Sequence, residues 1–313
     1  MTVRRAVDFL IVVALQPELE AAIRHFGPVE QGSGEYFATV PRRGGGKYQV
    51  AIVNIGDMGP ESAQRETNAA LSRLRVNRVI LIGIAAGFPE SGVEYGDLML
   101  PLWIVDYEKS KVSDGWWGLR HLKIQDRGHE FRVNQALYHA AQTIAASTGG
   151  GWGTRVSVPR PDGSVQLAGV RHGPDSAIGS GSKLVASRLF STRKRLVAKG
   201  TLGVEMEAIG VVHACLMRDT PVLVLKASQD YATSQKDAPK EKDKWRAYAC
   251  DVAAAFAREL VEMFVVSHDS LIAQHLAKLD VAMQGPLARN SSLRVLRTAR
   301  SNTRRCHAPA FCH

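Results

Sequence analysis

The sequence lacks any long apolar stretch. No run of hydrophobic residues approaches the roughly 20 residues that a membrane-spanning helix requires, so we expect no membrane partner. The first residues lead directly into an apolar run that begins at Phe9, without the apolar core and small-residue cleavage site of a signal peptide. We therefore expect a cytoplasmic protein.

Cysteine is scarce, with four residues in a chain of 313. Cys215 and Cys250 lie in apolar helical patterns, where a small buried residue is the ordinary interpretation. Cys306 and Cys312 each precede a histidine, but their spacing matches no familiar zinc pattern. The sequence thus predicts no metal site, and we expect no cofactor.

Aromatic residues are almost absent from the C-terminal end, although that end is strongly basic. The segment from His268 onward contains seven lysines and arginines and two acidic residues, so it accounts for +5 of the chain's net charge of +10. Such a segment can bind nucleic acid, but a nucleic-acid reader interleaves aromatic side chains with its charges, and only Phe311 is present. A solvated extension explains the charge at least as well. We divide the chain into a folded domain at 1–267 and a basic, partly disordered extension at 268–313, and we expect no nucleic-acid partner.

Apolar strands alternate with helical patterns in the folded domain. Continuous apolar runs such as Phe9–Leu15 and Val79–Ile84 are typical of strands buried on both faces. Pro17 and Pro60 stand where helices begin, because a missing N–H costs nothing in the first turn. Further predicted elements are a hairpin over 36–55, irregular chain over 116–130, a strand over 222–225 and a long helix over 242–265. This order favours an α/β fold, a single domain with a central mixed, largely parallel sheet flanked by helices.

Two short runs carry the candidate chemistry. The first is Gly-Val-Glu-Met-Glu-Ala, in which Glu205 and Glu207 flank Met206. In the second, Lys-Ala-Ser-Gln-Asp, the end of an apolar strand delivers Lys226 and Asp230. Open α/β sheets bind their ligands at the carboxyl ends of strands. Two acidic sites that converge there indicate a polyhydroxylated substrate that develops positive charge.

Together the two runs resemble those of the nucleoside phosphorylase superfamily, and within it the methylthioadenosine/S-adenosylhomocysteine nucleosidase branch. That branch has Val-Glu-Met-Glu-Ala, which holds the ribose, and an Arg-Ala-x-Ser-Asp-like run, which supplies an acid to the purine. Residues 204–208 match the first run letter for letter; in the second, Lys226 replaces Arg and Gln229 replaces Ser, with Asp230 in place. The resemblance covers residues 8–265. It implies a nucleoside phosphorylase-like catalytic domain that hydrolyses the N-glycosidic bond of an adenine nucleoside or nucleotide and releases adenine.

The resemblance implies a role for each residue of these runs. Asp230 would protonate the purine at N7, since a purine anion is a poor leaving group, and burial would help it to hold that proton. Glu207 and Met206 would hold the ribose, and Glu205 would either join them or support the run. Taken alone, each acidic residue could be a helix cap or a partner of the helix dipole. The order and spacing of the two runs favour the functional interpretation.

Glu18 matches the family's glutamate after the first strand. That residue orders the attacking water and shares its protons with the ribose glutamate and a basic residue, which is Lys226 in this chain. The other substrate contacts implied by the resemblance are Ala86, Gly87, Leu184 and Val185. Leu184 stands where the family has an aromatic side chain against the purine.

The choice between water and phosphate as nucleophile depends on two positions of one strand. Phosphorylases of the family hold phosphate with an Arg and a Ser, where this chain has Leu81 and Ile84, and their Gly-Asp-Pro-x-Arg loop is replaced by Ala14–Glu18. Buried phosphate needs charge-assisted hydrogen bonds, which aliphatic side chains cannot supply. Hydrolysis is therefore favoured over phosphorolysis.

The 5′ substituent of the substrate stays open. A methylthio group requires an apolar pocket, whereas the phosphates of AMP or ATP would require basic residues. The arginine and lysine clusters of this sequence are of the kind that usually lies on solvated faces. The alternatives are an AMP or ATP nucleosidase, a phosphate-dependent purine nucleoside phosphorylase and a non-catalytic nucleoside sensor. Retention of Glu18, Glu207 and Asp230 argues against the sensor. The family also implies a homo-oligomer, a dimer or larger.

Overall fold

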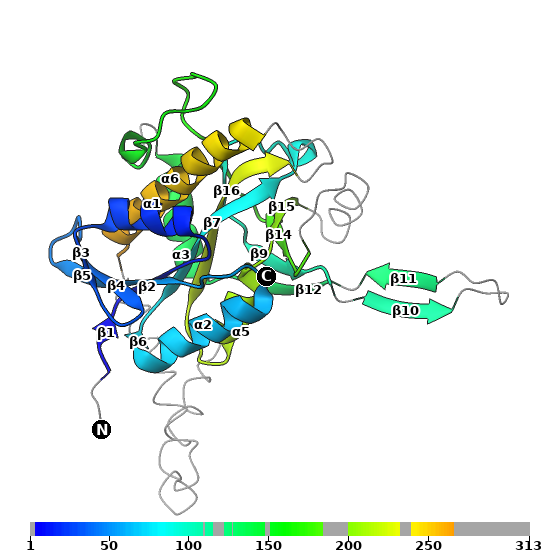
Figure 1. The fold of residues 1–313 in the computed structure, drawn as a ribbon, viewed down its shortest axis with the longest axis horizontal. Coiled ribbons are helices and arrows are strands. Elements are labelled where there is room, and N and C mark those ends of the chain that lie inside the picture. Colours follow the sequence, from blue (N-terminus) through cyan, green and yellow to red (C-terminus); the bar gives the residue numbers. More distant parts are fainter. Residues whose placement is uncertain are drawn as a thin grey trace, which may run out of the picture. The chain divides into compact units, whose positions relative to one another are not determined.

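The sheet is built around three strands whose residues are almost all buried, and two of these strands are entirely apolar. The computed structural model describes residues 4–108, 110–114, 122–126, 128–147, 151–183, 200–231 and 239–265. Strand β7 (Val79–Gly87) lies between β2 (Phe9–Val13) and β16 (Val222–Tyr231) and runs parallel to both. Side chains of all five β2 residues are buried, as expected for strands with both faces covered. Figure 1 shows these strands crossing the centre of the molecule.

The chain changes direction at β2. From β2 it passes through α1 (Gln16–Phe26) to β5 (Lys47–Asn54), and from β5 it returns through α2 (Pro60–Arg73) to β7, on the other side of β2. The two crossover connections have the same handedness but run in opposite directions along the sheet, so their helices lie on opposite faces. Figure 1 shows α1 beside α6 on one side and α2 beside α5 on the other. Such a reversal opens a crevice at the carboxyl ends of the strands.

Most of the remaining elements extend this sheet or cover it, and two pairs of strands, β1 with β6 and β10 with β11, form separate small sheets. The other strands are β1 (Ala6–Val7), β3 (Val29–Gln31), β4 (Glu35–Pro41), β6 (Arg75–Val76), β8 (Leu98–Met99), β9 (Trp103–Asp106), β10 (Ser110–Asp114), β11 (Leu122–Asp126), β12 (His129–Arg132), β13 (Val170–Arg171), β14 (Ala177–Ser180) and β15 (Thr201–Glu205). The other helices are α3 (Gln135–Ala146), α5 (Ala208–Leu216) and α6 (Pro239–Met263), with short 3-10 turns at Pro89–Ser91 and Gly153–Arg155. Strands β14 and β15 are parallel to each other, and β15 pairs antiparallel with the end of β7.

Most of the predicted elements are confirmed. The hairpin is formed by β4 and β5, and both prolines open their helices. The prediction of irregular chain over 116–130 is wrong where β11 and β12 form. Strand β12 pairs with β9 only, and its side chains are mostly exposed, so it carries no apolar run that would reveal it in the sequence.

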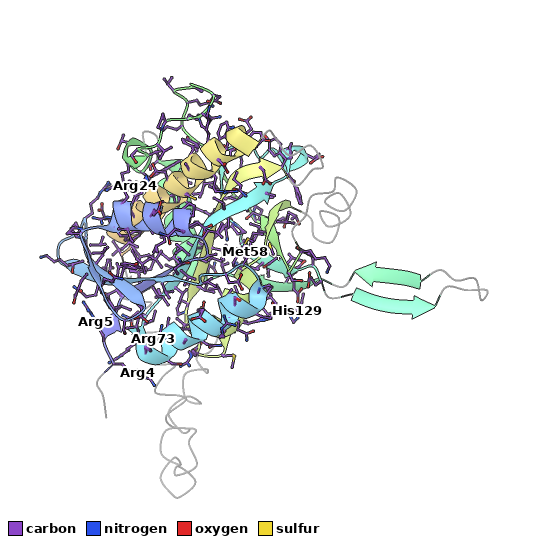
Figure 2. The ribbon with its side chains drawn as sticks, viewed as in Figure 1. Arg4, Arg5, Arg24, Met58, Arg73 and His129 are labelled. Carbon is purple, nitrogen blue, oxygen red and sulfur yellow. The ribbon has the colours of Figure 1, made fainter. Side chains whose placement is uncertain are left out.

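Several charged side chains among the described residues form ion pairs on the outside of the fold. Arg5 pairs with Glu30, Arg73 with Glu35, and Arg24 with the buried Asp251. Figure 2 shows Arg5, Arg24 and Arg73 spread over the outside of the fold. The Arg5–Glu30 pair is exposed on both sides and adds little to stability, whereas the carboxylates of the other two pairs are buried.

Candidate active site

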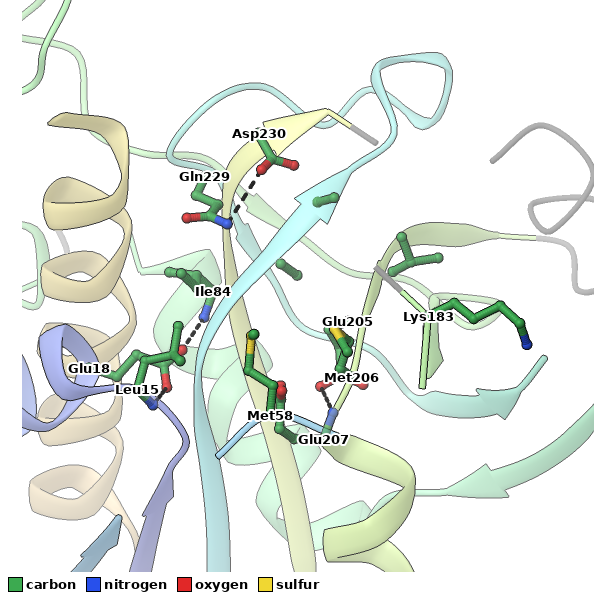
Figure 3. Close-up of a pocket in the computed structure, with 13 residues that line it drawn as sticks. Leu15, Glu18, Met58, Ile84, Lys183, Glu205, Met206, Glu207, Gln229 and Asp230 are labelled. Carbon is green, nitrogen blue, oxygen red and sulfur yellow. Dashed lines mark hydrogen bonds between the residues drawn. The ribbon is translucent and has the colours of Figure 1, made fainter. Parts of the chain in front are cut away.

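One pocket opens where the chain reverses direction, at the carboxyl ends of β2, β7, β15 and β16. Its described lining consists of Leu15, Glu18, Met58, Ile84, Ala85, Ala86, Lys183, Val204, Glu205, Met206, Glu207, Gln229 and Asp230. Figure 3 shows Glu18 on one side, the Glu205–Glu207 run on another and Asp230 at the far end. Apolar strand residues form the walls, and the acidic groups lie at the ends of β15 and β16, in the bend after β15 and in the first turn of α1. This is the place where an open α/β sheet binds its ligand.

The Glu18 carboxylate is fixed by three backbone amides. Its Oε2 accepts hydrogen bonds from Ala14 N at 2.8 Å and Leu15 N at 3.0 Å, and its Oε1 accepts one from Ile84 N at 2.9 Å. Gly83 makes this approach possible, because a Cβ at that position would lie 2.3 Å from Glu18 Oε1. The first turn of α1 and the middle of β7 are thus joined through one buried side chain.

The two glutamates of the Glu-Met-Glu run have different surroundings. Glu205 accepts hydrogen bonds from Glu207 N at 3.0 Å and from Ala208 N at 3.0 and 3.1 Å, so its carboxylate caps the N-terminus of α5. Glu207 Oε2 accepts a hydrogen bond from Lys226 Nζ at 2.9 Å. Glu205 is therefore turned toward the backbone of the run, and Glu207 is held by a side chain from β16.

Lys226 lies beneath both glutamates and is fully buried. Its Nζ is 2.9 Å from Glu207 Oε2 and 3.2 Å from Glu205 Oε2. Burial by itself would lower the pKa of Lys226, but the charges of Glu207, Glu205 and Glu18 outweigh it and raise that pKa above its ordinary value. The ammonium group stays charged, and it is the cation around which three carboxylates of the pocket are arranged.

Two opposing effects act on the pKa values of the buried glutamates: burial raises them, and the ammonium group of Lys226 lowers them. Burial raises the pKa of Glu18 above its ordinary value; Lys226 acts to lower it, and Glu207 adds to the increase. Burial likewise raises the pKa of Glu205, again against Lys226. A carboxyl whose pKa is raised takes up a proton more readily than an ordinary one, which suits a group that receives a proton from water.

Asp230 stands at the opposite end of the pocket from Glu18. It is the ninth residue of β16, mostly buried, and it pairs in register with Ala86 of β7. Its Oδ2 accepts a hydrogen bond from Gln229 Nε2 at 3.4 Å (Figure 3). One strand therefore delivers Lys226 to the base of the glutamate cluster and Asp230 to the far wall.

A family model described as the phosphorylase superfamily matches residues 8–264. The chain belongs to the phosphorylase superfamily. Its fold agrees with that of methylthioadenosine/S-adenosylhomocysteine nucleosidase from Neisseria meningitidis, with a TM-score of 0.60 and 20% identity over 82% of this chain and 98% of that one.

Curated relatives lie among nucleosidases. The ATP nucleosidase Cap17 of Escherichia coli is 26% identical over 238 residues, which cover 73% of this chain and 46% of the relative. A death domain-containing ATP nucleosidase of Amphimedon queenslandica is 24% identical over 266 residues, 81% of this chain and 48% of the relative. The chain thus spans about half the length of the curated relatives that it matches.

Most of the site residues expected from the sequence of this family member lie in the pocket. Six of them line it: Glu18, Ala86, Glu205, Met206, Glu207 and Asp230. Lys226 lies behind the wall rather than in it. Gly87 is also outside the lining; a Cβ there would lie 2.6 Å from Ser228 Oγ, so its role is to let β7 and β16 approach. Leu184 and Val185 lie outside the described residues.

Sequence reasoning missed Met58, which is half exposed and lines the pocket from the loop before α2. The signal was available, because the Gly-Asp-Met-Gly-Pro turn follows β5, and β5 is parallel to β2 and ends at the same edge of the sheet. Lys183 was also missed. Its ammonium is 2.9 Å from Glu108 Oε1 at the pocket rim.

Neither a membrane span nor a metal site is formed by the described residues. None of the helices in this part of the chain is long and apolar enough to cross a membrane. Among the same residues, no three His, Cys, Asp or Glu side chains are arranged to hold a metal ion.

Proposed function

We propose that this chain hydrolyses the N-glycosidic bond of an adenine nucleoside or nucleotide and releases adenine. The observation that carries the proposal is that Glu18, Glu207 and Asp230, which are far apart in the sequence, line one pocket. Hydrolysis requires a proton for the leaving base, stabilisation of a cationic sugar and an activated water. Each of the three carboxyls is suited to one of these tasks.

Asp230 is the group we assign to the leaving base. When the bond between the anomeric carbon and N9 breaks, its electron pair stays with the purine, and a proton from Asp230 to N7 neutralises that charge. General-acid help of this kind contributes typically about 10²–10⁴-fold. The position of Asp230 in the pocket wall at the end of β16 supports the assignment, because a general acid must lie within reach of the atom that it protonates.

Glu207 is the group we assign to the ribose. Its Oε2 is held by Lys226, which leaves Oε1 to accept hydrogen bonds from sugar hydroxyls. As the sugar becomes an oxocarbenium ion these hydroxyls become more acidic, and their hydrogen bonds to a fixed carboxylate strengthen. Met206 packs beside them as an apolar wall. Interactions that grow toward the transition state raise the rate rather than only the affinity.

Glu18 is the group we assign to the attacking water. Three amide hydrogen bonds fix its carboxylate, and the second lone pair of Oε1 is the one that can accept a proton from water. The water oxygen bonds to the anomeric carbon, and its proton passes to Glu18. The raised pKa of Glu18 supports this role, since a raised pKa makes a carboxylate a stronger base toward water.

Water is the nucleophile that the pocket wall favours. Leu81 is fully buried within β7, and Ile84 presents an aliphatic side chain to the pocket. A phosphate anion placed against this wall would lose its hydration without charge-assisted hydrogen bonds in return. We therefore expect the free sugar, and not its 1-phosphate, as the second product.

The test is chromatography of the reaction products. The purified chain is incubated with methylthioadenosine, S-adenosylhomocysteine, AMP, ATP, inosine and guanosine, each with and without phosphate. We expect free adenine from at least one adenine substrate in the absence of phosphate. A strict requirement for phosphate would refute hydrolysis, and base released only from inosine or guanosine would refute adenine specificity.

The 5′ substituent is the finer part of the proposal. The curated relatives are ATP nucleosidases, which supports AMP and ATP as candidates beside the methylthio substrates. We also propose that the catalytic domain is 1–267, that the chain works as a homo-oligomer, and that it acts in the cytoplasm. Its two described cysteines are free thiols, as is usual in a reducing compartment.

A further inference from the structure

Gln229 connects the candidate acid Asp230 to helix α6. Its Nε2 donates to Asp230 Oδ2 at 3.4 Å, and its Oε1 accepts a hydrogen bond from Arg246 Nε at 3.2 Å. Gln229 lines the pocket beside Asp230 and is half-buried (Figure 3). We infer that Gln229 and Arg246 are positioning residues that fix the orientation of the Asp230 carboxyl and thereby favour 6-aminopurines. This inference rests on the proposed function.

Arg246 decides which way the carboxamide of Gln229 points. A guanidinium group has only donors, whereas a carboxamide has one acceptor end and one donor end. The acceptor, Oε1, must therefore face Arg246, and the donor, Nε2, is left to face Asp230. Arg246 is itself held one turn back on α6, where its Nη1 lies 3.4 Å from Asp243 Oδ1. The polarity of the amide is thus set from outside the pocket.

The orientation of the amide determines where Asp230 carries its proton. The N–H of Gln229 points at Oδ2, and a proton on Oδ2 facing it would clash with it. The acid proton of Asp230 is therefore placed on Oδ1. Oδ1 then donates to the purine, and the remaining lone pair of Oδ2 accepts. Adenine offers the matching pair, an N7 acceptor and a 6-amino donor. A 6-oxopurine presents an acceptor to Oδ2 instead, which leaves a buried polar group unpaired.

Gln229 stands where the resembled nucleosidase run has Ser. A serine hydroxyl both donates and accepts, so the fixed polarity described here depends on this chain's own Gln229 and Arg246.

Substitution of Arg246 tests the inference. Arg246→Met keeps the length of the side chain and removes the donor, and Arg246→Lys restores a donor on a similar stem. With the adenine substrate that the wild type cleaves fastest, we expect Arg246→Met to lower kcat by about tenfold to a hundredfold, the effect of a lost hydrogen bond to a charged group. KM should change much less, and Arg246→Lys should recover part of kcat. Lys244→Met is the matched control, because Lys244 is exposed on the same helix and should behave as wild type.

Calorimetric binding of free adenine and hypoxanthine gives a readout that does not depend on turnover. The adenine preference should fall by about tenfold in Arg246→Met, and it should fall at least as far in Gln229→Glu, which places a second carboxylate beside Asp230. An unchanged kcat and an unchanged preference in both variants would overturn the inference while leaving the proposed hydrolysis intact. If the wild type cleaves nothing, the proposed function fails, and the binding ratio alone still decides whether Gln229 and Arg246 orient Asp230.

Discussion

Lys226→Met is the substitution that most directly tests how the pocket holds its charges. Lys226 is fully buried, and its ammonium contacts Glu207 Oε2 at 2.9 Å and Glu205 Oε2 at 3.2 Å. Methionine has a similar length and no charge. The change leaves two buried carboxylates without their cation and introduces little change in packing.

The distances give the size of the effect. At an effective dielectric constant of about 20, the two contacts correspond to roughly 6 and 5 kcal/mol of gross attraction. The free energy needed to strip water from the three charges opposes most of this. Removal of one partner from a buried ion pair typically costs about 3–5 kcal/mol, because the other partner remains buried and uncompensated. We therefore expect Lys226→Met to lower the free energy of unfolding by about that amount at pH 8.

The loss should depend on pH in a defined direction. The pKa of Lys226 is raised in the folded state above its ordinary value of 10.5, so its contribution is fully present below that pH and is lost as the pH rises through the folded value. Without Lys226, burial raises the pKa of Glu205 further above 4.5. A buried carboxyl with a raised pKa destabilises the folded state when the pH is high enough that the carboxyl must ionise. The deficit of the variant should thus be largest at pH 8 and shrink toward pH 5.

Urea unfolding at pH 8 and pH 5 measures this difference. Glu205→Gln in the Lys226→Met background should recover part of the loss at pH 8, because it removes one of the two stranded charges. A variant as stable as the wild type at pH 8, or a deficit that grows toward pH 5, would refute the ion-pair reasoning.

Four other changes test the assigned roles and the domain boundary. Asp230→Asn should abolish base release without affecting thermal unfolding, because it removes the acid proton and keeps the shape of the side chain. Glu207→Gln should raise KM and lower kcat. Near wild-type rates for both variants would show that the site is misplaced. Gly83→Ala should reduce kcat by at least about tenfold, because its methyl group displaces the Glu18 carboxylate; an active variant would contradict that close approach. A chain ending at residue 280 should keep its fold and its base release, measured by circular dichroism and chromatography, whereas inactivity would place part of the extension at the site or a subunit contact.

Much of the fold follows from local sequence patterns. Apolar runs identify β2 and β7, the two prolines mark the starts of α1 and α2, and the alternation of elements predicts a largely parallel sheet. Strand β12 could not be found in this way, because an edge strand with exposed side chains has no apolar signature. The prediction therefore failed at an edge strand whose side chains are mostly exposed.

The residue types of the site were also available in the sequence. The run that ends in Glu207 and the run that ends in Asp230 share their letters and spacing with a known family, and Glu18 follows the first strand as it does there. Few kinds of side chain can protonate a base or hold a sugar, so two short motifs in the right order are enough to identify the candidates.

Only the tertiary structure decided how these residues divide the work. Both glutamates contact Lys226, but only Glu205 also accepts hydrogen bonds from the backbone amides at the start of α5, because the bend between β15 and α5 turns its carboxylate toward them. Arg246 faces Gln229 because α6 packs along β16. Contacts between residues so far apart in sequence depend on the order of strands in the sheet, and no local pattern specifies that order.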